Sequence, residues 1–194
     1  MPLTHLLYLH GFRSSPRSAK AQIVAKWLAR HRPELQLWLP QLPPSPAEAM
    51  QMIHSGLAPW PSASMAVMGS SLGGFYATVL AEARGCRAVV LNPAIHPERD
   101  LARHIGHHSH WHDPASGFDF LPRHVEELTD MQISRLAEPQ RYAAVIAKGD
   151  ELLDWREMAA RYQGAQMRLL EGSDHALSDF EDHLSFVMHF LELC

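Results

Sequence analysis

Short apolar runs bounded by glycine, proline and polar residues recur along most of the chain. Each has the length of a buried strand, and between several of them apolar side chains recur at the three- and four-residue spacing of an amphipathic helix. This alternation predicts an α/β fold, with a mostly parallel sheet and helices on both faces. The predicted strands span residues 3–10, 35–39, 65–68, 88–91, 142–147 and 167–170.

Helix boundaries follow from capping residues. Ser15 followed by Pro16 predicts a helix start, because the hydroxyl can accept a bond from a free amide and proline needs no donor at the first helical position. Ser178 and Glu181 have the spacing of a capping box and predict that the last helix begins at about residue 179. The other predicted helices span residues 46–55, 75–83 and 155–162.

Between residues 96 and 138 this rhythm is lost. Mixed polar stretches, interrupted by glycine and proline, leave only short helical pieces. We interpret this segment as a cap or lid insertion. The whole chain, residues 1–194, has a length that suits a single domain with one well-buried core.

Charge and cysteine content narrow the expected partners and compartment. Seventeen Lys and Arg against 21 Asp and Glu give a net charge of −4 without a long basic run. We therefore expect neither nucleic acid nor a membrane surface as a partner. The uncharged run 49–81 is broken by prolines, glycines and serines, which predicts a buried centre and not a membrane span. Cys86 and Cys194 form no disulfide framework and the first residues lack signal-peptide features, which predicts a reducing, cytoplasmic setting.

The segment GSSLG at 69–73 fits the pattern Gly-x-Ser-x-Gly between a predicted strand and a predicted helix. In that context the middle serine occupies a sharp turn, and the glycines let the neighbouring strand and helix approach it. Ser71 is therefore the candidate nucleophile, and the backbone N–H of Leu72 is a candidate oxyanion donor. Ser70 is a poor rival because bulky residues stand two positions away on either side.

A serine hydroxyl needs a base to take its proton, and the base needs an acid to orient it. Asp150 follows the predicted strand 142–147, and His175 precedes the last predicted helix. Both fall beyond the carboxyl ends of strands, where reacting groups of parallel sheets gather, and their order suits a nucleophile on such a turn. Asp154 is a competing acid at a plausible helix start. Asp174 either fixes the histidine loop or is a solvated turn residue.

The first predicted strand ends in Gly11 and Phe12. If this strand neighbours the one before Ser71, the backbone N–H of Phe12 joins that of Leu72 as the second oxyanion donor. Gly11 would then let the two backbones come close.

Fourteen histidines are present, five of them between His104 and His112. The order His112-Asp113 is the reverse of a His-x-His-x-Asp-His metal motif, and the segment offers few rigid neighbours, so we expect no metal site. No glycine loop has a nucleotide-binding fingerprint, and no cofactor is expected. The large apolar residues here either line an acyl pocket or anchor the insertion to the body of the domain; they are Trp111, Phe118, Phe120 and Leu121.

Further motifs occur in order along nearly the whole chain: YLHGF at 8–12, SSP at 14–16, SAKA at 18–21, GSSLGGFYA at 69–77, NPA at 92–94, GDE at 149–151, LD at 153–154 and GSDH at 172–175. Together they resemble the α/β-hydrolase superfamily, and more closely the small bacterial YqiA/YcfP-like esterases. The resemblance implies an intracellular serine esterase for small acyl esters and acyl-CoA thioesters, with Ser71, Asp150 and His175 as the triad.

The leading hypothesis is thus two-step acyl transfer from a small-molecule ester or thioester to water. A peptidase or an acyltransferase with the same triad is an alternative, because a fold does not determine its substrate. A binding protein that has the fold without the activity is a third hypothesis.

Overall fold

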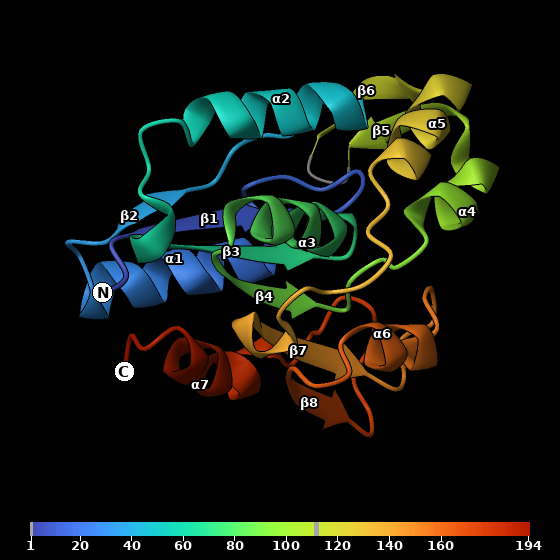
Figure 1. Ribbon diagram of the computed structural model, residues 1–194. Coiled ribbons are helices and arrows are strands. Elements are labelled where there is room, and N and C mark those ends of the chain that lie inside the picture. The colour runs from blue at the N-terminus through green and yellow to red at the C-terminus, as the bar shows by residue number, and fades with distance from the viewer. Residues whose placement is uncertain (1, 111–112) are drawn as a thin grey trace.

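The computed structural model describes residues 2–110 and 113–194, and a six-stranded sheet forms its centre (Figure 1). All neighbouring strands run parallel, in the order β2-β1-β3-β4-β7-β8. The six predicted strands are confirmed as the strands of this sheet. Their bounds are β1 His5–Leu9, β2 Gln36–Trp38, β3 Met65–Ser70, β4 Arg87–Leu91, β7 Tyr142–Ala147 and β8 Gln166–Leu170.

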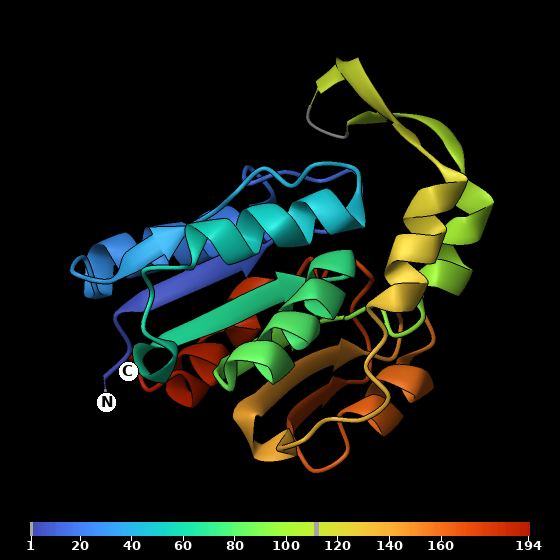
Figure 2. The ribbon, with the colours of Figure 1, turned by 45° about the horizontal axis from the view of Figure 1, so that its top comes forward.

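Helices cover both faces of the sheet because successive strand side chains point to opposite sides. In β1, Leu7 and Leu9 share a core with residues of α2, α3 and α6, whereas Leu6 and Tyr8 share one with α1 and α7. Figures 1 and 2 show these two helical layers. The helices are α1 Ala19–His31, α2 Pro46–Gly56, α3 Leu72–Arg84, α6 Trp155–Arg161 and α7 Phe180–Phe190, with 3-10 turns at Ser62–Ser64 and Pro139–Arg141.

The segment between β4 and β7 carries two short helices and an antiparallel hairpin. Helix α4 (Pro97–Leu101) and a 3-10 turn (Ala102–His104) lead into β5 (Gly106–His110) and β6 (Asp113–Phe120), and α5 (Pro122–Asp130) returns to the sheet. Figure 2 shows the hairpin standing away from the sheet, on the side toward which the strands point. The prediction of helical pieces alone was wrong here, because GHHSH in β5 has no apolar alternation to indicate a strand.

The predicted start of the first helix was wrong, and so was the predicted cap of the last helix, although α7 begins at Phe180, next to the predicted residue 179. Helix α1 begins at Ala19, and the Ser15 hydroxyl instead accepts a bond from the Arg17 N–H at 3.1 Å in the preceding turn. The predicted capping box does not form, since Ser178 lies outside α7 and its hydroxyl donates to the Asp174 carboxylate at 2.6 Å. In both places a local side-chain bond in a turn replaced the cap.

The uncharged run 49–81 separates into most of α2, the fully buried β3 and the buried α3. Within 2–110 and 113–194, no helix combines the length and apolar character required to cross a membrane. The run therefore supplies the centre of the fold, as predicted, and its β3–α3 junction carries Ser71.

Candidate active site

Ser71 occupies the junction between β3 and α3 in a backbone conformation that serine rarely adopts. Its φ of 55° and ψ of −120° carry a strain of about 1–3 kcal/mol. Four backbone hydrogen bonds hold the turn: the Ser71 N–H donates to the Leu91 carbonyl at 3.0 Å, and the Ser71 carbonyl accepts from Gly74 at 2.9 Å, Ala94 at 3.0 Å and Phe75 at 3.3 Å. The strain therefore persists because the neighbouring segments fix the turn on both sides.

The glycines of the motif are required by close backbone contacts. A Cβ atom at Gly69 would lie 2.0 Å from the Gly73 carbonyl oxygen, and one at Gly73 would lie 2.0 Å from the Leu9 carbonyl oxygen. Neither contact is sterically possible. The close packing of β3, α3 and β1 thus explains why glycines stand two positions before and after Ser71.

His175 lies between Ser71 and Asp150 and bonds to both. Its Nδ1 is 2.7 Å from Asp150 Oδ2, and its Nε2 is 3.0 Å from Ser71 Oγ. A carboxylate only accepts hydrogen bonds, so Nδ1 carries the proton and Nε2 is left to accept from the serine hydroxyl. The Asp150 side chain is fully buried, whereas 17% of the His175 side chain is exposed. The structure thus brings together the three residues that the sequence predicted.

The two candidate acids in the loop after β7 have different hydrogen-bond partners. Asp150 Oδ1 accepts from the N–H groups of Leu152 and Leu153, both at 2.9 Å, which leaves Oδ2 for His175. Asp154 is instead the N-cap of α6 and accepts from the Arg156 N–H at 2.9 Å. The carboxylate that contacts the imidazole is therefore that of Asp150.

Asn92, for which the sequence predicted no role, holds the loop that carries His175. Its amide nitrogen donates to the carbonyl oxygens of Asp174 at 2.9 Å and His175 at 3.2 Å, and its oxygen accepts from the Ala147 N–H at 2.8 Å. Asn92 is fully buried. The Glu151 carboxylate holds the same loop, since it accepts from the His175 N–H at 3.0 Å. Two signals were available: its position directly after a predicted strand, and its place in the NPA motif at 92–94.

We expect Asn92→Ala to lower both turnover and stability. The substitution leaves the Ala147 N–H without its partner and frees the loop that carries His175, so unfolding free energy should fall by about 2–4 kcal/mol. Ester turnover should fall about 10- to 100-fold, because an imidazole displaced by about 1 Å loses its alignment. Urea unfolding and steady-state kinetics measure the two effects. Thr78→Val is the control: it removes a buried hydroxyl bonded to Gly74 and Tyr162, and it should lower stability without lowering turnover. Wild-type turnover in Asn92→Ala would show that Asn92 does not position His175.

Asp174 is part of a local turn rather than of the bonded set around Ser71. Its carboxylate accepts from the N–H of Ser178 at 2.9 Å and from the Ser178 hydroxyl. These bonds lower the pKa of Asp174. Of the two interpretations of this residue, the structure favours the one in which it fixes the loop.

The two predicted oxyanion donors flank Ser71. Leu72 is the first residue of α3, where a backbone N–H has no acceptor within the helix. On the other side, a Cβ atom at Gly11 would lie 3.2 Å from Ser71 Cβ, so the loop that carries Phe12 runs against the serine. The buried His10 secures this loop: Nδ1 bonds to the Gly11 carbonyl at 2.9 Å, and Nε2 accepts from the Leu42 N–H at 3.1 Å.

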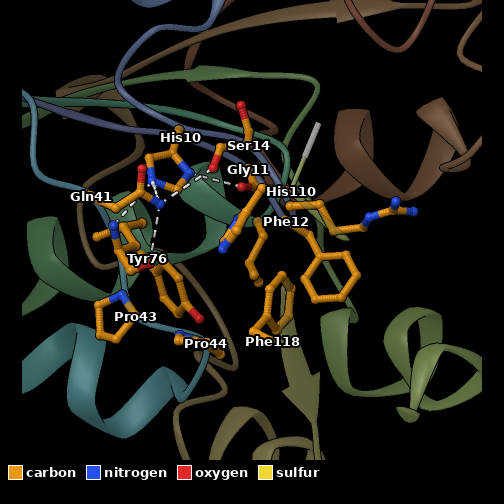
Figure 3. A pocket seen from close by; sticks show the side chains of 13 residues that line it. His10, Gly11, Phe12, Ser14, Gln41, Pro43, Pro44, Tyr76, His110 and Phe118 are labelled. Atoms are coloured by element: carbon orange, nitrogen blue, oxygen red, sulfur yellow. Dashed lines mark hydrogen bonds between the residues drawn. The ribbon is translucent and has the colours of Figure 1, made fainter. Parts of the chain in front are cut away.

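The side chain of Phe12 joins this loop to the hairpin. Figure 3 shows its ring beside that of Phe118, and the His10 imidazole facing Gln41. Ring centroids of Phe118 and Phe120 lie 5.6 and 5.2 Å from that of Phe12, and Phe120 is fully buried. Phe120 is therefore an anchor of the inserted segment, and Trp111 lies outside the described residues.

The described histidines between 104 and 110 do not converge on one point. His107 bonds to Asp119 at 2.9 Å, whereas the rings of His104 and His108 lie 5.9 and 5.3 Å from that of Phe12. His112 and the side chain of Asp113 are not among the described positions. Where side chains are described, no three His, Cys, Asp or Glu residues come together as a metal would require.

A cleft of about 650 Å³ opens beside Ser71 and His175. Apolar side chains such as Phe12 and Leu153 line it, together with five charged residues: Arg13, Lys20, Asp100, Arg103 and Glu151. At its rim, burial and then the charges of Arg103, His108 and Arg13 lower the pKa of His104. The cleft is large enough for a substrate that extends well beyond a short acyl group.

Comparison with known proteins places this geometry in a family. The model described as an uncharacterised protein family, UPF0227, matches residues 5–192. The chain belongs to this family. The expected YqiA-like membership is thereby confirmed for this UPF0227 protein over nearly its whole length.

Solved structures similar to this UPF0227 protein have the α/β-hydrolase fold, which confirms the predicted fold class. A putative hydrolase from Agrobacterium vitis matches with a TM-score of 0.72 and 13% identity, over 98% of this chain and 91% of its own. Mouse α/β hydrolase domain-containing protein 10 matches with a TM-score of 0.70 and 13% identity, over 95% and 87%. A Pyrococcus furiosus esterase matches with a TM-score of 0.66 and 16% identity, over 98% and 82%.

Proposed function

We propose that this protein is a serine hydrolase that cleaves small acyl esters or thioesters through an acyl-enzyme. The observation that carries the proposal is the pair of hydrogen bonds at His175, 3.0 Å to Ser71 Oγ and 2.7 Å to Asp150 Oδ2. A nucleophile, a base and an orienting acid in contact are the minimum that acyl transfer by serine requires. The esterase name of one structural neighbour, from Pyrococcus furiosus, agrees with this proposal.

In the first half of the reaction, Ser71 Oγ attacks the substrate carbonyl carbon while His175 Nε2 takes the hydroxyl proton. The buried Asp150 carboxylate keeps Nδ1 protonated and stabilises the imidazolium that forms. The carbonyl oxygen becomes an oxyanion, and the backbone N–H groups of Phe12 and Leu72 donate to it. Each such donor typically contributes about 100- to 1,000-fold in turnover.

In the second half, the bond between the carbonyl carbon and the leaving oxygen or sulfur breaks, and His175 returns its proton to that atom. Water then attacks the acyl-enzyme, with His175 again as base. The bond to Ser71 Oγ breaks, the serine regains its proton and the carboxylic acid leaves. The chemistry needs no cofactor.

Covalent labelling tests this proposal directly. A fluorophosphonate probe should react with the wild-type protein, and peptide mass spectrometry should find the adduct on Ser71. Ser71→Ala should not react, whereas Ser70→Ala, which alters the adjacent serine of β3, should still be labelled at Ser71. A wild-type protein that is folded and resists the probe would refute the proposal.

A further inference from the structure

Three polar residues line the cleft beside Ser71 and His175 but make no contact with either of them. Tyr8 comes from β1, Ser18 directly precedes α1, and Lys20 lies in its first turn. Tyr8 is only 1% exposed, and its aromatic ring belongs to the core between the sheet, α1 and α7. These three residues are here called the Tyr8 subsite.

The hydroxyl groups of the Tyr8 subsite lack ordinary hydrogen-bond partners. Tyr8 Oη and Ser18 Oγ are both buried, and neither has a hydrogen bond of normal geometry to any residue in the described part of the chain. Burial raises the pKa of Tyr8, and the adjacent Ser18 hydroxyl acts in the opposite direction. Even a mutual pair would use one O–H and leave the other without an acceptor. A buried donor of this kind is uncommon, and in a cleft a water molecule or a polar group of a ligand can satisfy it.

Lys20 adds donors to the subsite, and nearby carboxylates partly offset its charge. Its ammonium donates to the Ala176 carbonyl, next to His175, and two further N–H groups remain. Burial lowers the pKa of Lys20, and the carboxylates of Asp174 and Asp150 oppose that effect. Glu151 lines the same cleft. The two carboxylates that act on Lys20 offset part of its charge, which favours a neutral oxygen atom over an anion as the ligand.

We propose that the Tyr8 subsite binds a hydroxyl group of the substrate, so that the preferred substrates are hydroxylated esters or thioesters. A hydroxyl oxygen accepts from Tyr8 and Lys20, and its own proton can go to Ser18 Oγ. The inference rests on the proposed function, because the subsite acts on a molecule that Ser71 cleaves. A polar group with buried donors rejects a substrate that leaves them unpaired, which makes these residues determinants of specificity.

Matched ester pairs test the subsite on both sides of the scissile bond. The alcohol-side pair is 2-hydroxyethyl butyrate and propyl butyrate; the acyl-side pair is ethyl 3-hydroxybutyrate and ethyl 3-methylbutyrate. Each pair differs by a hydroxyl in place of a methyl group. We expect wild-type kcat/KM to favour the hydroxylated member of one pair about tenfold, as one hydrogen bond allows. In Tyr8→Phe and in Ser18→Ala, this preference should fall to near one.

Tyr162→Phe is the matched control, since Tyr162 is an equally buried tyrosine whose hydroxyl bonds to Thr78 at 2.6 Å. It should lose stability and keep the preference. Tyr8→Phe should keep or raise the melting temperature, because it removes a hydroxyl without a good partner. Ser18→Ala preserves the test if Tyr8→Phe fails to fold.

The outcomes separate the subsite from the catalytic proposal. If the enzyme is labelled at Ser71 but hydrolyses both members of each pair equally, it has no such subsite. The same conclusion follows if the preference for the hydroxylated ester is unchanged in Tyr8→Phe. Preference for monoethyl succinate over both hydroxylated esters would overturn the proposal in favour of an anion site. A protein that cleaves none of these esters and resists the fluorophosphonate refutes the proposed function and the subsite with it.

Discussion

Ser71→Ala is expected to reduce kcat for ester hydrolysis by about a million-fold, with little change in KM. The serine oxygen forms the acyl-enzyme bond, so its loss leaves only the oxyanion donors and substrate binding, which retain about 10³–10⁴-fold over water. His175→Ala should cost a similar factor. Asp150→Asn should cost about 10⁴-fold, because the amide donates to Nδ1 and selects the wrong tautomer. Steady-state kinetics with a p-nitrophenyl ester measures all three effects.

The double variant Ser71→Ala/His175→Ala should be no slower than either single variant, since residues that act as a unit are not additive. Asp154→Asn is the matched control for the acid: it alters a carboxylate four residues away that caps α6, and it should retain nearly wild-type turnover. Additive losses, or a larger loss at Asp154 than at Asp150, would refute the assigned roles.

Gly73→Ala should destabilise the fold by at least about 4–5 kcal/mol or prevent folding. Helix propensity alone predicts the opposite sign, because alanine is favoured over glycine inside a helix by about 1 kcal/mol. The close contact decides the outcome: a Cβ atom at Gly73 would lie 2.0 Å from the Leu9 carbonyl oxygen, so α3 must move away from β1. Urea unfolding followed by circular dichroism measures the change.

Gly172→Ala is the control for that experiment, because a Cβ atom there meets nothing within 4 Å. It should change the free energy of unfolding by less than about 0.5 kcal/mol, as surface substitutions usually do. A Gly73→Ala protein as stable as this control would show that α3 and β1 are not packed as closely as described.

The sheet was predictable because its strands carry their own signal. The runs 142–147 and 65–68 are continuous and apolar, and the structure buries β7 and β3 at every position. The hairpin was not predictable, since β5 reads GHHSH and owes its pairing to β6 and to the contact of Phe120 with Phe12. The start of α1 depended on turn bonds near Ser15 that leave no periodic pattern.

The candidate site was predictable where chemistry and chain order coincide. Ser71, Asp150 and His175 each follow a strand of one parallel sheet, so the topology brings them to one edge; their catalytic roles stay predictions. Asn92 and Tyr8 stand in motifs of the resemblance, but their roles were not predictable because their partners lie elsewhere in sequence. Asn92 contacts the loop at His175, and Tyr8 lies beside Ser18, which precedes α1. Such contacts arise from packing and leave no local pattern.

The hydrogen bond between Ser71 and His175 joins positions 104 residues apart. During synthesis Ser71 and the two residues predicted to supply oxyanion donors leave the ribosome well before Asp150 and His175, which flank β8 at the edge of the sheet. A nascent chain therefore holds a serine without a base until β8 and α7 have docked. In the proposed mechanism, the protein can form an acyl-enzyme only after these last elements have packed against the sheet.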